Sequence, residues 1–132
     1  MSVNEFRGPS ISAVAAEALT QYRFVNLAGT TAVEAMKCSI SDTGEVAVGI
    51  VAETVASGDN APIFLPGSIG LLCVDGGTDI AAGDHLKPHT DSSGKGIKTT
   101  TDKDFFGAVA LEPATDDADV IRVMIVYGYH AA

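Results

Sequence analysis

Short runs of apolar and β-forming residues alternate with glycine-rich turns along most of this chain. Residues 22–27 show the pattern first, and further runs occupy 33–40, 46–51, 63–65, 69–74, 97–100, 105–111 and 120–127. Short strands separated by turn signals every 8–12 residues or so are typical of β-sandwiches and barrels. We therefore predict a mainly β fold, a compact antiparallel β-sandwich or barrel of short strands. The pattern does not distinguish a sandwich from a closed barrel.

The first twenty residues follow a different pattern. Residues 1–10 are polar and end in Gly-Pro-Ser, so we predict an N-terminal arm over residues 1–20 and a single β-domain over 21–132. Within the arm, apolar residues fall on one helical face, with Ser10 as the N-cap, which predicts a short helix over 11–21. The alternative is an extended arm along a partner. The residues of that face are Ile11, Val14, Ala15, Ala18, Leu19 and Tyr22.

One pattern of strand, turn and strand occurs twice. It covers 49–52, 58–59 and 62–65 in the first copy, and 107–110, 118–119 and 120–125 in the second. A partial echo lies at 80–84. The turns place Gly-Asp, or Ala-Asp in the second copy, before the strand, where Gly supplies a positive φ and Asp binds its own backbone. A repeated packing unit without a reactive cluster beside it indicates a structural protein rather than an enzyme.

Charge and apolar content narrow the possible partners. The formal net charge is −9, and the eight Lys and Arg residues are scattered, whereas nucleic-acid binding needs a basic face, so we expect no direct nucleic-acid partner. The N-terminal residues 1–5 lack the apolar region of a signal peptide, and no apolar run is long enough to span a membrane. We therefore expect no membrane association, and we expect the protein in a reducing cytoplasm or in a particle assembled there. Cys38 and Cys73 lie in apolar runs and are interpreted as small buried residues.

The best candidate for a metal site is a polar segment that reads as a strand entering a hairpin. His85 and His89 flank Pro88 there, and residues four apart on a strand lie too far apart for easy chelation of one ion. We therefore predict an exposed polar hairpin edge and no metal. The candidate ligands are Asp84, His85, His89 and Asp91.

Other candidate chemistry is equally weak. An acidic cluster formed by Asp116, Asp117 and Asp119 lacks the bidentate last ligand and flanking helices of a calcium loop, so we interpret it as a solvated turn. No Ser-His-Asp set and no phosphate-binding glycine loop can be assigned. We expect neither enzymatic activity nor a cofactor.

The order of these elements resembles that of tailed-phage capsid decoration, or cement, proteins. The resemblance spans residues 20–127 and rests on turn and packing motifs at 24–27, 49–52, 58–59, 80–84, 94–96, 107–112 and 119–121. It implies a homotrimer, made in the host cytoplasm, that binds the outer surface of an assembled phage head. There it would bridge neighbouring subunits of the major capsid protein and stabilise the shell. It implies no catalytic residues.

Position and residue type suggest where such a protein would touch the capsid or a neighbouring protomer. We expect Phe6, Arg7, Ile11 and Val14 to anchor the arm, and Tyr22 and Arg23 to bind where the arm meets the domain. At the other end of the chain, amphipathic residues fit either an interface or a cap on a barrel end. These are Tyr127, Tyr129 and His130.

Three other functions remain open. A tail or fibre-associated virion module would share the fold. A trimeric small-nucleotide hydrolase of the dUTP-hydrolase kind needs more arginines than Arg7, Arg23 and Arg122, and residues 76–80 only superficially echo its substrate loop. A small ligand-binding barrel is disfavoured by the low aromatic content.

Overall fold

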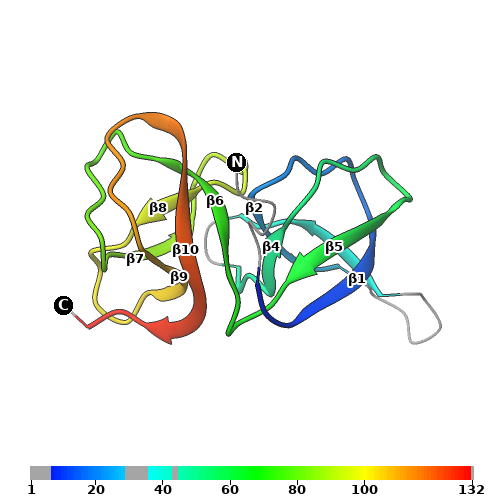
Figure 1. Cartoon of the computed structure of the whole chain (residues 1–132), viewed down its shortest axis with the longest axis horizontal. Helices are drawn as coiled ribbons and strands as arrows, with labels where there is room; N and C mark the ends of the chain where they lie inside the picture. Colours follow the sequence, from blue (N-terminus) through cyan, green and yellow to red (C-terminus); the bar gives the residue numbers. More distant parts are fainter. Residues whose placement is uncertain (1–6, 29–35, 43–44, 132) are drawn as a thin grey trace.

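The chain folds into two β-barrels that lie side by side. The computed structural model describes residues 7–28, 36–42 and 45–131, and within these it contains ten strands and no helix. The prediction of a mainly β protein is confirmed, and the choice between sandwich and barrel is decided in favour of closed barrels. Figure 1 shows the two barrels as separate lobes.

Each barrel has five strands. The first contains β1 (Ser10–Ala15), β2 (Arg23–Leu27), β3 (Lys37–Ile40), β4 (Gly49–Val51) and β5 (Asn60–Phe64). The second contains β6 (Ile69–Asp75), β7 (His85–Pro88), β8 (Gly96–Lys98), β9 (Phe105–Ala110) and β10 (Asp117–Tyr129).

The second barrel repeats the topology of the first, strand for strand. The closed order β1-β3-β2-β4-β5 corresponds to β6-β8-β7-β9-β10. The first and third strands pair in parallel in both barrels, and the other neighbours pair antiparallel. Isolated bridges also correspond, since Leu19 and Val55 exchange two backbone hydrogen bonds as Ile80 and Ala114 do. The repeat seen in the sequence is therefore one part of a duplicated barrel.

The strand register corrects the sequence alignment of the two copies by one residue. Gly49 lies opposite Val25, and the equivalent residue opposite Leu86 is Ala108, not Gly107. Gly49 is required for a different reason: a Cβ atom there would lie 2.1 Å from the carbonyl oxygen of Phe64 on β5. Gly49 and Gly107, which the sequence repeat aligns with each other, thus have different packing roles in the two barrels.

The predicted helix over residues 11–21 is wrong. Residues 10–15 form β1, which pairs with β5 along its length and with β3 at its end. Ala13 and Ala15 point into the barrel, where their small side chains fit the narrow interior. The prediction failed because the small apolar residues of this segment fit the helical period of 3.6 residues as well as the strand period of 2. The first barrel therefore begins at residue 10 instead of 21. Arg7 exchanges two backbone hydrogen bonds with Ile69, so the described segment just before β1 is tied to β6 of the same chain.

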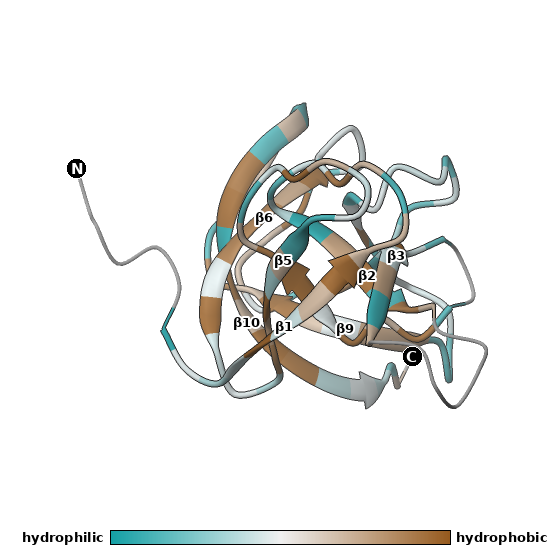
Figure 2. Ribbon diagram, turned by 90° about the vertical axis from the view of Figure 1, so that its right-hand side faces the viewer, coloured by the Kyte–Doolittle hydropathy of each residue, from teal (hydrophilic) through white to brown (hydrophobic). Residues whose placement is uncertain are grey.

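The two barrels share part of their hydrophobic core. One cluster of buried side chains combines Phe24, Ala47 and Ile50 of the first barrel with Leu72 and Leu86 of the second, among others. A second cluster lies inside the first barrel alone. Along β10, hydrophobic and hydrophilic segments alternate, as Figure 2 shows, because one face of the strand lines the barrel and the other faces solvent. The shared cluster joins the barrels into one body.

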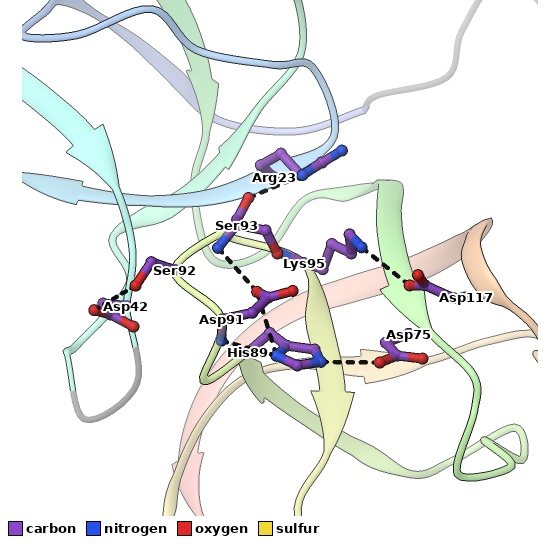
Figure 3. Close-up of polar contacts among 9 residues, drawn as sticks. All are labelled: Arg23, Asp42, Asp75, His89, Asp91, Ser92, Ser93, Lys95 and Asp117. Carbon is purple, nitrogen blue, oxygen red and sulfur yellow. Dashed lines mark hydrogen bonds and ion pairs between the residues drawn. The ribbon is translucent and has the colours of Figure 1, made fainter.

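The loop between β7 and β8 connects the barrels from outside the core. Within this loop, the carbonyl oxygen of Gly94 accepts a 2.7 Å hydrogen bond from the Phe24 N–H. The Arg23 guanidinium donates to the Ser93 carbonyl oxygen at 3.0 Å, and the Ser92 hydroxyl donates to Asp42 at 2.9 Å. Figure 3 shows this loop held against the first barrel.

Candidate interaction surface

An apolar groove of about 410 Å³ opens where the two barrels meet. The end of β2, the segment before β4 and the last part of β10 supply its walls, so it contains residues from both barrels. Its lining residues are Asn26, Leu27, Glu45, Val46, Val48 and Tyr127.

The groove exposes large apolar side chains that usually lie inside a protein. Leu27 is 51% exposed, Val46 is 59% exposed and Tyr127 is 41% exposed. Single exposed apolar residues are ordinary, whereas several gathered on one surface mark an interaction site. The groove is therefore a candidate for contact with another molecule.

Tyr127 fixes one wall of the groove and links the barrels. Its hydroxyl donates a 2.6 Å hydrogen bond to the carbonyl oxygen of Val48, and burial raises the pKa of this hydroxyl. Since the polar group is satisfied within the chain, the ring presents apolar surface to the groove. Phe105 lies beside it, with ring centres 5.6 Å apart, and continues the surface to Tyr129, which is 73% exposed.

A carboxylate stands in the lining of this apolar groove. One oxygen of Glu45 accepts a hydrogen bond from the Asn26 side-chain amide at 3.0 Å, and the other accepts from the Asp42 N–H at 2.7 Å. The side-chain oxygen Oδ1 of Asn26 accepts in turn from the Ser39 hydroxyl at 3.1 Å. The negative charge therefore has a fixed position next to Leu27 and Val46.

The described residues among the predicted anchors of the arm and of its junction with the domain lie outside the groove. Phe6 is outside the described residues, and none of the other five lines the groove. Arg7 is exposed beside β6, while the side chains of Ile11 and Val14 are half-buried on β1. Their roles in binding stay a prediction.

Tyr22 and Arg23 take part in contacts between the barrels. The Tyr22 carbonyl oxygen accepts a 2.7 Å hydrogen bond from the Cys73 N–H, and Arg23 binds the β7–β8 loop. Of the groove residues, only Tyr127 stood out in the sequence. Leu27 and Val46 belong to ordinary strand-like runs, and nothing in those runs separates an exposed apolar residue from a buried one.

The polar residues considered for chemistry are engaged in structural hydrogen bonds. His89 lies between Asp75 and Asp91: its Nε2 is 2.9 Å from the Asp75 carboxylate, and its Nδ1 accepts from the Asp91 N–H (Figure 3). His85 stacks on Phe106 and approaches His130, with 2.9 Å between their Nδ1 atoms. Over the part of the chain that the structure describes, no group of three or more His, Cys, Asp or Glu residues is arranged to hold a metal ion.

The two cysteines and the acidic cluster have structural surroundings in the fold. Cys38 and Cys73 are buried, and burial raises the pKa of both thiols. Asp119 accepts hydrogen bonds from the backbone N–H groups of Thr115 and Asp116, which is the geometry of a turn. In residues 7–28, 36–42 and 45–131, no helix has the length and apolar character needed to cross a membrane.

Comparison with known proteins identifies both sequence and fold relationships. A family model described as phage cement protein matches residues 7–125, which include nearly all of both barrels. The fold is similar to that of the head fiber gp8.5 N base in bacteriophage phi29, with a TM-score of 0.68 and 18% sequence identity. That likeness covers 89% of this chain and 92% of the phage chain, and at this identity it concerns the fold alone. No curated protein matches the sequence.

Proposed function

The chain belongs to the phage cement protein family and is a structural protein of a phage virion, and we propose that it binds the outer capsid surface and bridges neighbouring major capsid subunits. The observation that carries this proposal is the extent of the family match over residues 7–125. Nearly all of the two-barrel body corresponds to the family, and not only a small motif within it.

The physical character of the molecule supports this role. The groove offers apolar contact area and one carboxylate, but no nucleophile beside a base, so its lining suits binding better than catalysis. A small contact is sufficient for a cement protein, because many copies act on one particle and, in an oligomer, several contacts act together. The excess of acidic groups is tolerable on the outside of the shell, away from packaged nucleic acid.

The test is binding of purified protein to undecorated, expanded capsids of the phage, with bound copies counted after sedimentation. We expect saturation at a fixed multiple of the threefold positions of the capsid, and a homotrimer by mass in solution. Decorated particles should also withstand a higher temperature before they break. Absence of co-sedimentation at any salt concentration would contradict the proposal.

A second candidate is a fibre-associated module of the virion. The similarity to a head fiber base favours it through the shared fold. Such a module would bind its capsid position without changing the temperature at which the particle breaks. The heating experiment therefore separates the two roles.

A further inference from the structure

The groove combines two features that recognise different parts of a ligand. Leu27, Val46 and Val48 form an apolar floor and wall, and the Tyr127 ring closes one side. Glu45 adds a negative charge to the same lining. A partner segment that fits both features has an apolar side chain with a cationic one close beside it.

The Glu45 carboxylate is positioned to bind a cation. Among the described residues, it accepts hydrogen bonds from neutral donors, the Asn26 amide and a main-chain N–H, which hold the carboxylate without neutralising its charge. Each carboxylate oxygen has a further lone pair available for a second donor. A charge whose position is already fixed loses little side-chain entropy when a Lys or Arg binds to it.

Charge disfavours a second copy of this chain as the occupant. Each copy has a formal net charge of −9, and a self-contact at the groove would bring further negative charge towards Glu45. Like charges placed opposite each other in an interface oppose binding. A partner with a basic side chain beside an apolar anchor meets no such repulsion.

We propose that this groove is the contact with the major capsid protein, and that it receives an exposed capsid segment carrying an apolar side chain adjacent to Lys or Arg. This inference rests on the proposed function and names the surface that performs it. The apolar side chain fills the space between Val46 and Tyr127, and the cation pairs with Glu45.

The experiment is a co-sedimentation titration with undecorated capsids, using two groove variants and two matched controls. Val46→Asp places a charge in the apolar floor and should weaken binding at least about tenfold. Val120→Asp makes the same change at a valine that is 45% exposed on β10 outside the groove, and binding should stay within about twofold. Melting temperatures of both variants show that they remain folded.

Glu45→Gln tests the charge. It should weaken binding about threefold to tenfold at low salt and reduce the salt dependence of binding, because it removes one ion pair. Glu53→Gln removes one charge from an exposed residue elsewhere on the first barrel and should change neither quantity.

The outcomes are distinguishable. If the unmodified protein saturates capsids and both groove variants bind equally well, the proposed function stands and the groove inference is wrong. If the unmodified protein does not bind, both are wrong. If Val46→Asp lowers the mass of the free protein in solution, the groove is a contact between copies, and this inference is overturned.

Discussion

Four residues adopt the left-handed backbone conformation in corresponding pairs, three of them at turns and Ala118 at the irregularity near the start of β10. Gly58 and Ala118 precede the aspartates that lead into the last strand pairing of each barrel, with φ of 89° and 65°. Gly83 and Tyr22 occupy equivalent positions before β7 and β2, with φ of 94° and 64°. In each pair one barrel has glycine and the other accepts a side chain. Because a Cβ atom raises the energy of this conformation by about 1 kcal/mol, the duplicated turns differ in strain.

Exchanging the residues of one such pair tests this strain. Ala118→Gly should raise the free energy of unfolding by up to about 1 kcal/mol, and Gly58→Ala should lower it by about 1 kcal/mol. A Cβ atom at Gly58 would have no neighbour within 4 Å, so the loss arises from the backbone alone. Urea unfolding measures both changes. Ala56→Gly, at a position without a positive φ, is the control and should destabilise slightly. A neutral Gly58→Ala would show that the turn carries no strain.

At the scale of elements, the β7–β8 loop makes the fold sensitive to acid. A hydrogen bond from the Gly77 N–H and a second from His89 lower the pKa of Asp75, and hydrogen bonds from Ser93 lower the pKa of Asp91. A carboxyl group with a lowered pKa in the fold stabilises it above the ordinary carboxyl pKa of about 3.9. This stabilisation is lost as the pH falls below about 4, because the group then takes up a proton more readily in the unfolded chain.

We therefore predict that Asp91→Asn destabilises the protein at pH 7 and that the difference from the unmodified protein shrinks at pH 3. Urea unfolding at both pH values measures this change. Asp79→Asn, in an exposed part of the loop after β6, is the control and should give the same small effect at both. A difference for Asp91→Asn that stays constant between the two pH values would contradict a role for its charge.

The elements differ in how far the sequence determines them. Residues 22–27 and 105–111 were correctly predicted as strands because alternation and β-forming side chains are local signals. Residues 11–21 were assigned wrongly because small apolar residues satisfy helical and extended periods alike. The groove could not be foreseen: Leu27 and Val46 belong to ordinary apolar runs, and only the fold shows that they are exposed. Tertiary arrangement, not local pattern, decides which apolar residues remain available for a partner.

At the scale of the whole molecule, the barrels should behave as one cooperative unit although each closes on itself. Phe24, which is fully buried, belongs to the first barrel but packs in the core cluster that fills the second. Its N–H also binds the Gly94 carbonyl oxygen of the β7–β8 loop. Separating the barrels would expose this shared cluster, so neither barrel can unfold without loss of contacts to the other.

Scanning calorimetry tests this coupling. We predict a single transition whose calorimetric enthalpy equals its van't Hoff enthalpy, and Phe24→Ala should lower the free energy of unfolding by about 3–5 kcal/mol. The matched control is Val25→Ala, the next residue, whose buried side chain belongs to the cluster inside the first barrel alone. It should destabilise less and leave one transition. Two separate transitions in the unmodified protein would mean that the two barrels unfold independently of each other. A single transition would mean that the two barrels unfold together, because they share the core cluster in which Phe24 packs.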